Sequence, residues 1–91
     1  MSKIQVKHNP DQEKLEQQGV FEWPIWEKEV SKFDWFYAET EYCYIIEGSA
    51  IITTETEQVV EIEKGDFVKF PRGLNCVWEV TEYIRKHYNF K

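Results

Sequence analysis

The sequence predicts an all-β protein, a small antiparallel barrel or sandwich preceded by a short N-terminal helix. From residue 20 to residue 90, short runs of alternating apolar and polar side chains are separated by Gly, Pro and charged residues, which is typical of antiparallel strands. No helical period interrupts these runs, so an α/β fold is excluded. The 91 residues are the length of one domain. We therefore expect a single domain over residues 1–91, with a helical arm at 1–19 and a barrel at 20–90.

The helix is expected over residues 10–18. Asn9 precedes Pro10, as an N-cap residue precedes a proline at the first helical position. Gly19 stands where a helix commonly ends. Leu15 supplies an apolar anchor, and we expect the other side chains of this helix to be solvated.

The strands are expected at even spacing along the rest of the chain. The first run contains Pro24, which cannot donate a backbone hydrogen bond, so this run is expected to be an edge or bent strand. Turns are expected at residues 47–48, 55–57, 64–66 and 71–73, where Gly, Pro or polar residues interrupt the pattern. The eight expected strands are 20–26, 32–37, 41–46, 50–54, 59–63, 67–70, 76–80 and 84–90.

The composition excludes several classes of partner. The formal net charge is −6, whereas nucleic acids and anionic membrane surfaces attract clustered Lys and Arg. No run approaches the roughly 20 apolar residues of a membrane-spanning helix, and residues 1–11 lack the apolar segment of a signal peptide. The two cysteines, Cys43 and Cys76, lack the spacing of a zinc ribbon and are too few for a disulfide scaffold. We therefore expect a cytoplasmic protein that binds neither nucleic acid nor membranes.

Two fragments carry a family resemblance. In the first, Glu41 is followed after six residues by Gly48; in the second, Gly65 is followed after five residues by Pro71 and then Gly73. They resemble the two motifs of the cupin superfamily, G-x5-H-x-H-x(3,4)-E-x6-G and G-x5-P-x-G-x2-H-x3-N. The resemblance covers about residues 20–90. It implies a small jelly-roll barrel and a homodimer formed by strand exchange or sheet packing.

Further segments resemble one branch of this superfamily. Trp35 and Glu41 followed by Cys43-Tyr44, then Cys76-Val77-Trp78, then Arg85-Lys86-His87-Tyr88, look like short single-domain cupins. This branch groups them with ureidoglycine aminohydrolase-like and ethanolamine-utilisation cupins.

The metal-ligand positions of the motifs are mostly changed. Cupins typically hold Mn, Fe, Ni or Zn with three histidines and one glutamate. Carried over by position, the glutamate matches Glu41, the histidines of the first motif fall on Trp35 and Tyr37, and the histidine of the second falls on Cys76. We therefore expect no cofactor and no metal site of the usual kind.

Two alternative sets of metal-ligand positions are also considered. A four-residue spacer would move the first two ligand positions to Asp34 and Phe36. A divalent metal held by the altered set Glu41, Cys76 and His87 is kept as an alternative, because three protein ligands are the least that a zinc-type site needs.

The barrel mouth near Glu41 and Cys76 is the expected site. An inward Glu41 would be costly unless paired, with Arg72, Arg85 or a ligand as the expected partner. Cys76 is either a small buried side chain or a nucleophile, and a nucleophile would need a lowered thiol pKa. The candidate ligand-binding residues are Trp35, Tyr37, Glu41, Cys76 and Trp78, and the candidate catalytic residues are Glu41 and Cys76.

Four functions follow from these residues. The first is a small-molecule-binding barrel without the three-histidine metal site, with aromatic walls and one carboxylate suited to a sugar, a polyol or a small nitrogenous compound. The second is a metal-dependent enzyme of the ureidoglycine aminohydrolase-like type. The third is metal-free catalysis with Glu41 as base and Cys76 as nucleophile. The fourth is a structural or regulatory homodimer whose barrel is filled by side chains.

Overall fold

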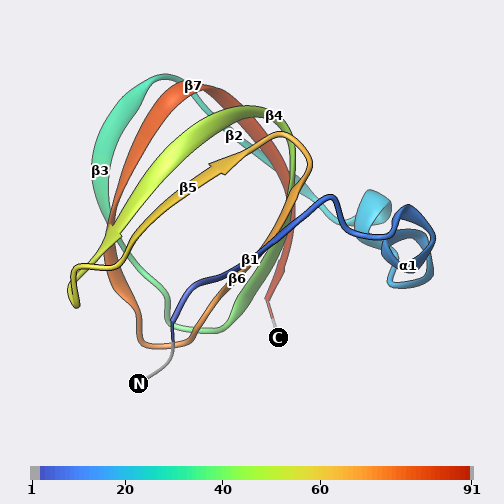
Figure 1. The fold of residues 1–91 in the computed structure, drawn as a ribbon, viewed down its shortest axis with the longest axis horizontal. Helices are drawn as coiled ribbons and strands as arrows, with labels where there is room; N and C mark the ends of the chain where they lie inside the picture. The colour runs from blue at the N-terminus through green and yellow to red at the C-terminus, as the bar shows by residue number, and fades with distance from the viewer. Residues whose placement is uncertain (1–2, 91) are drawn as a thin grey trace.

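The computed structural model describes residues 3–90, and the outermost residues of the predicted domain, 1, 2 and 91, lie outside the described residues. Figure 1 shows strands curving around a common interior, with the helix projecting from one side of the barrel. This arrangement confirms the predicted all-β fold with a short N-terminal helix. In chain order the elements are β1 (Gln5–His8), α1 (Gln12–Gln17), the 3-10 helix η1 (Val20–Glu22), β2 (Ile25–Lys28), β3 (Ser31–Phe36), β4 (Glu41–Thr54), β5 (Val59–Glu63), β6 (Asp66–Phe70) and β7 (Asn75–Phe90).

The two longest strands connect both halves of the barrel. β4 and β7 pair antiparallel from Glu41↔Phe90 to Thr54↔Cys76. At one end of this pair the strand order is β1-β6-β4-β7-β2, and at the other end β5 pairs with β4 and β3 pairs with β7. Side chains alternate along each strand, so every second residue of β4 and β7 points into the interior.

β4 and β7 are each continuous, although the sequence predicted two strands in each region. Gly48 bends β4 with a φ of 84°, and the pairing register shifts between Ile45 and Ala50. β7 bends at the same level, where the hydroxyls of Ser49 and Thr81 lie 2.7 Å apart. The predicted turn at residues 47–48 is wrong because the partner strand bends as well, so pairing continues through the glycine.

The N-terminal arm lies across the barrel and was not predicted to contain a strand. β1 has only Val6 as an apolar residue of clear strand character, so the sequence gives no alternation there. Its order comes from pairing with β6 and from His8, whose Nδ1 lies 2.7 Å from Asp66 Oδ1. Gln58, the residue before β5, binds the arm, since its side chain accepts from the Ile4 amide at 3.1 Å and donates to the Ile4 carbonyl at 3.2 Å.

The helix and the first predicted strand both begin later than expected. Asp11, not Asn9, is the N-cap of α1, and its Oδ1 accepts from the amide of Glu13 at 2.9 Å. Gly19 follows the helix in the left-handed conformation, as predicted. Residues 20–22 form η1 and Pro24 follows it, so β2 starts only at Ile25. β2 pairs with β7 alone, which agrees with the predicted edge strand.

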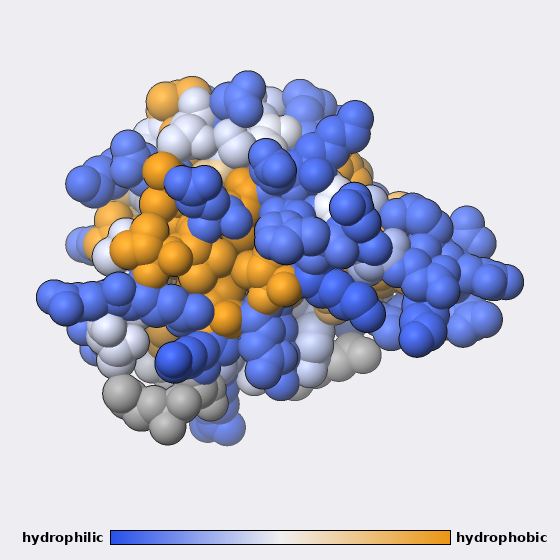
Figure 2. Space-filling view, in the orientation of Figure 1, coloured by the Kyte–Doolittle hydropathy of each residue, from blue (hydrophilic) through white to orange (hydrophobic). Residues whose placement is uncertain are grey.

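Most side chains buried in the interior are apolar. Cys43, Ile45, Ile52, Val68 and Ile84 are fully buried, and both cysteines are free. On the outer surface, Figure 2 shows a group of apolar residues over β5 and on the side of β5 that faces β1. Hydrophilic residues surround this group. Within residues 3–90, no helix is long and apolar enough to cross a membrane.

Candidate functional site

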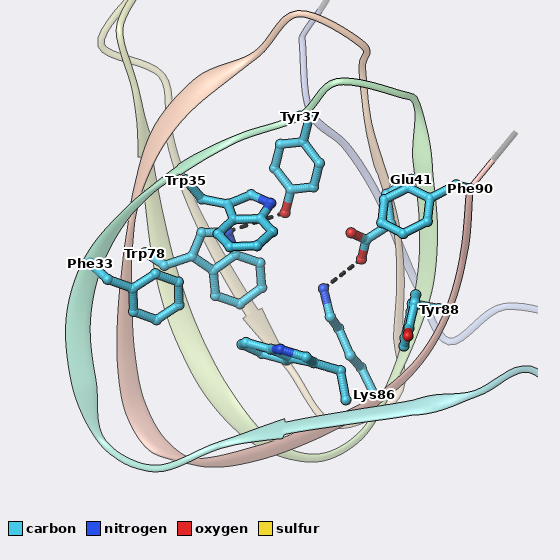
Figure 3. Close-up of a pocket in the computed structure, with 9 residues that line it drawn as sticks. Phe33, Trp35, Tyr37, Glu41, Trp78, Lys86, Tyr88 and Phe90 are labelled. Carbon is cyan, nitrogen blue, oxygen red and sulfur yellow. Dashed lines mark hydrogen bonds and ion pairs between the residues drawn. The ribbon is translucent and has the colours of Figure 1, made fainter.

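A cavity of about 230 Å³ lies inside the barrel. Figure 3 shows its side chains directed toward a shared space from several strands. The cavity reaches the surface beside Trp35 and Phe90, which are 46% and 44% exposed. Seven of its nine lining residues are aromatic, and the full set is Trp26, Phe33, Trp35, Tyr37, Glu41, Trp78, Lys86, Tyr88 and Phe90.

The polar part of the cavity is a buried ion pair. Lys86 Nζ, from β7, lies 2.5 Å from Glu41 Oε2, on the first residue of β4. Both side chains are almost fully buried. Among the described residues, Lys86 is the only recorded hydrogen-bond partner of the Glu41 carboxylate, and no buried side-chain oxygen or nitrogen lacks a partner. It follows that the second carboxylate oxygen, Oε1, is accessible from the cavity.

Aromatic rings surround the Lys86 ammonium group. Its Nζ lies 4.9 Å from the ring centre of Trp26, 4.8 Å from that of Trp78 and 5.6 Å from that of Phe70. The negative face of an aromatic ring attracts a cation, most strongly where water is excluded. The three rings and Glu41 together allow a charged side chain to remain in an apolar interior.

Tyr37 is fixed by ring stacking and by the corner at residues 71–73. Its ring stacks on Phe70 with centroids 4.8 Å apart. Its backbone carbonyl accepts from Gly73 N at 2.7 Å and its amide donates to the Leu74 carbonyl at 2.9 Å. Gly73 has a φ of 86°, which explains the glycine at this corner. The Tyr37 hydroxyl oxygen accepts from Trp78 Nε1 at 3.2 Å.

The Tyr37 phenol remains protonated. Burial raises its pKa well above the ordinary value of tyrosine, and the negative charge of Glu41 raises the pKa further. The O–H group is therefore a hydrogen-bond donor across the physiological pH range. Because its oxygen already accepts from Trp78, its own proton is free to serve another acceptor.

Four of the five predicted ligand-binding residues line the cavity: Trp35, Tyr37, Glu41 and Trp78. Cys76 does not. It lines a separate surface hollow together with Trp35 and Phe36, and its Sγ lies 3.6 Å from the Trp35 carbonyl oxygen. Burial raises the pKa of the Cys76 thiol to about 11. The lowered pKa that a nucleophilic role for Cys76 would require is therefore not found.

His87 points away from the cavity. It neighbours Lys86 on β7, so its side chain lies on the opposite face of the strand. Its Nδ1 is 2.9 Å from the Trp23 carbonyl oxygen, and its ring meets the edge of Phe21. The structure does not bring Glu41, Cys76 and His87 together. In the described part of the chain, no three His, Cys, Asp or Glu side chains are arranged to hold a metal ion.

Lys86 was not predicted from the sequence as the partner of Glu41. Arg72 and Arg85 were expected instead, but Arg85 pairs with Glu27 at 3.2 Å. A signal was present, because Lys86 lies two residues from Ile84 and two from Tyr88 in an alternating strand. That period assigns Lys86 to the inward face. The other missed lining residues are Trp26, Phe33, Tyr88 and Phe90.

The fold and the position of the cavity define a barrel of the cupin class. The family model described as the EutQ-like cupin domain matches residues 15–88, and the chain belongs to this family. The predicted cupin membership is thereby confirmed. Likeness to ureidoglycine aminohydrolases stays a prediction.

Solved structures agree with this assignment. A DUF861 family protein from Thermotoga maritima is 52% identical with a TM-score of 0.95, over 98% of this chain and 100% of that one. The EutQ protein of Clostridium difficile is 26% identical with a TM-score of 0.66, over 72% of this chain and 52% of that one.

A more distant structure shares the fold alone. The putative ethanolamine utilization protein Q of Salmonella typhimurium is 18% identical with a TM-score of 0.66, over 72% of this chain and 53% of that one. The chain thus spans about half the length of these two EutQ proteins. No curated protein matches the chain.

Proposed function

We propose that the protein binds a small molecule in the barrel cavity and does so without the three-histidine metal site typical of cupins. The observation that carries this proposal is the open space left around the buried Glu41–Lys86 pair. A buried ion pair is no better for stability than well-packed apolar residues of the same volume. A purely structural barrel would gain by filling this space, so the pair and the cavity together favour a binding role.

The shape and charge of the cavity define the ligand in outline. Aromatic walls favour a flat, largely apolar body, and a volume of about 230 Å³ limits that body to a small molecule. Glu41 and Lys86 have opposite charges, so the site has little net charge of its own. Burying an additional unpaired charge there would be costly. An uncharged ligand with one polar end is therefore favoured.

The side chains at the ligand positions of the cupin motif do not fit a divalent metal ion, and one of them, Cys76, lies outside the cavity. The indole of Trp35 offers no lone pair, and the Tyr37 phenol keeps its proton because burial raises its pKa. Glu41 is bound to the ammonium group of Lys86, which would repel a metal cation. We expect purified protein to contain far less than one Mn, Fe, Ni or Zn ion per chain by plasma mass spectrometry. A stoichiometric content that survives dialysis would contradict this part of the proposal.

Tryptophan fluorescence tests the binding role. Three of the four tryptophans line the cavity, so the Trp23→Phe variant confines emission to the site. We expect 2-indanol, a flat uncharged alcohol, to change this emission in a saturable way. Replacing Trp35 with Ala in this background removes one exposed wall and should weaken binding by about two- to tenfold, since a lost aromatic contact costs about 0.5–1.5 kcal/mol.

The matched control is Phe36→Ala. Phe36 adjoins Trp35 on β3 and is 55% exposed, but it does not line the cavity. Its replacement should leave the affinity for 2-indanol unchanged. An equal loss of affinity in both variants would mean that the probe binds the outer surface, and the absence of any saturable change would overturn the proposed function.

A further inference from the structure

We propose that the cavity takes an uncharged carbonyl compound and removes a proton from the carbon next to the carbonyl group. Glu41 is the base, and Tyr37 and Lys86 donate hydrogen bonds to the carbonyl oxygen. This proposal rests on the small-molecule binding proposed above and specifies both the class of ligand and its reaction.

Three polar groups approach one region of the cavity from three parts of the chain. Tyr37 follows β3, Glu41 begins β4 and Lys86 belongs to β7. Figure 3 shows the Tyr37 hydroxyl, the Glu41 carboxylate and the Lys86 ammonium group directed toward the same interior space. All other lining residues are aromatic. A ligand held by these walls therefore meets its only charged contacts at Glu41 and Lys86, with the Tyr37 hydroxyl beside them.

Two of the three groups are hydrogen-bond donors, which suits a carbonyl oxygen. The Tyr37 oxygen accepts from Trp78, so its proton is available to an acceptor in the cavity. The Lys86 ammonium group has three N–H donors, and one of them binds Glu41 Oε2. A carbonyl oxygen has two lone pairs and can accept from both residues. An alcohol or amine would use this donor pair less fully.

Glu41 has one oxygen left for a proton. Oε2 is bound to Lys86, whereas Oε1 is accessible from the cavity. In the proposed step the C–H bond next to the carbonyl breaks, and its proton forms an O–H bond with Glu41. The electron pair of that bond forms a carbon–carbon double bond, and the carbonyl pair moves onto oxygen to give an enolate. Return of a proton to the carbon regenerates the ligand without any further reactant.

The charges of the pair suit this step. Before it, the negative charge opposite Lys86 is on Glu41; after it, Glu41 is neutral and the negative charge is on the enolate oxygen. Lys86 faces a negative partner in both states, and the net charge of the buried site does not change. Fixed donors aimed at an oxygen that becomes negative are an effective form of transition-state stabilisation. Tyr37 provides a second such donor.

Hydrogen–deuterium exchange measures the step directly. The probe is 2-indanone in D2O, with the loss of the proton NMR signal of its CH2 groups followed over time. We expect the protein to accelerate exchange above the buffer rate. Tyr37→Phe should slow the accelerated part by about 100-fold, as the loss of one donor to a developing oxyanion typically does. Glu41→Gln should abolish it while 2-indanone still changes the tryptophan emission.

Control variants separate this role from a merely structural one. Phe36→Ala should exchange 2-indanone at the rate of the unchanged protein. Near-UV circular dichroism establishes whether Glu41→Gln is folded, and if it is not, Tyr37→Phe carries the test because its ring still stacks on Phe70. A matching loss of binding and exchange in Tyr37→Phe would overturn the proposed donor role.

The outcomes distinguish this proposal from the proposed function. If 2-indanone binds and its exchange stays at the buffer rate, the proton-transfer step is wrong and the binding role stands. If 2-indanol binds and 2-indanone does not, the carbonyl class is wrong. Exchange that persists in folded Glu41→Gln would overturn Glu41 as the base. If neither compound binds, the proposed function fails together with this inference.

Discussion

Lys86 is held in the interior by interactions that act on its charge. Glu41 lies 2.5 Å from its Nζ, and three aromatic rings surround the ammonium group at 4.8 to 5.6 Å. Removing either partner leaves the other as an unpaired charge in an apolar space. Such a loss typically costs about 3–5 kcal/mol, far more than the intact pair contributes.

We therefore predict that replacing both residues of the pair destabilises the protein less than replacing either one alone. Lys86→Met and Glu41→Leu should each lower the free energy of unfolding by about 3–5 kcal/mol. The double variant should recover most of that loss, because no charge is left unpaired. Urea unfolding of the four proteins measures the coupling. Additive losses in the double variant would show that the pair is not coupled.

The sequence predicted several residues of this site but not the ion pair between Glu41 and Lys86. Alternation and the cupin motifs predicted Trp35, Tyr37 and Glu41, because these residues occupy motif positions on strands. Cys76 was predicted by the same rule and lies outside the cavity, since the motif fixes a position along the strand and not what the side chain contacts. The Glu41–Lys86 contact joins residues 45 positions apart, and it depends on strand pairing that the sequence pattern did not specify.

At the scale of the elements, Gly48 allows β4 to bend into both halves of the barrel. A Cβ atom at this position would lie 2.0 Å from the Tyr83 carbonyl oxygen and 2.8 Å from the Ile84 Cα. These neighbours are backbone atoms of β7, which cannot move without breaking the central strand pairing. The positive φ of 84° adds a second reason for glycine.

We predict that Gly48→Ala is strongly destabilising and that Gly73→Ala is the matched control. Gly73 has nearly the same φ, 86°, but a Cβ atom there would meet nothing within 4 Å. Gly73→Ala should lose about 1–2 kcal/mol from backbone strain alone. Gly48→Ala should lose clearly more, because the clash adds to the strain. Equal losses in urea unfolding would mean that the bend relaxes to admit a side chain.

At this scale, the sequence pattern did not distinguish a bend within a strand from a turn between two strands. Glycine and proline predicted the ends of β6 and the corner before β7, where a turn reverses the chain. Gly48 gave the same signal, but there the chain bends and continues. A short polar strand such as β1 gave no signal at all, because its order comes from pairing with β6. The order of strands in the sheet likewise depends on contacts between distant segments.

The free energy of unfolding of the whole molecule should fall in alkaline solution, because the pKa values of its two cysteine thiols are raised in the folded protein. Burial raises the pKa of Cys43 to about 12 and that of Cys76 to about 11, from an ordinary value of 9.0. Above pH 9 the unfolded chain therefore loses thiol protons that the folded protein still holds. The free energy of unfolding then falls as pH rises, whereas below pH 9 this contribution to stability is fully present.

We predict that Cys43 alone lowers the free energy of unfolding by about 1 kcal/mol between pH 9 and pH 10. Cys76 borders a surface hollow. Water in this hollow can solvate the thiolate, so we expect Cys76 to lower the free energy of unfolding by less than Cys43 does. The buried Tyr37 phenol, whose pKa is also raised, contributes less than a thiol in this window because its ordinary pKa is 10.0. In the Cys43→Ala variant, urea unfolding should show a shallower decline over the same interval, even if the variant is less stable at every pH. An unchanged slope would mean that alkaline destabilisation comes from other groups.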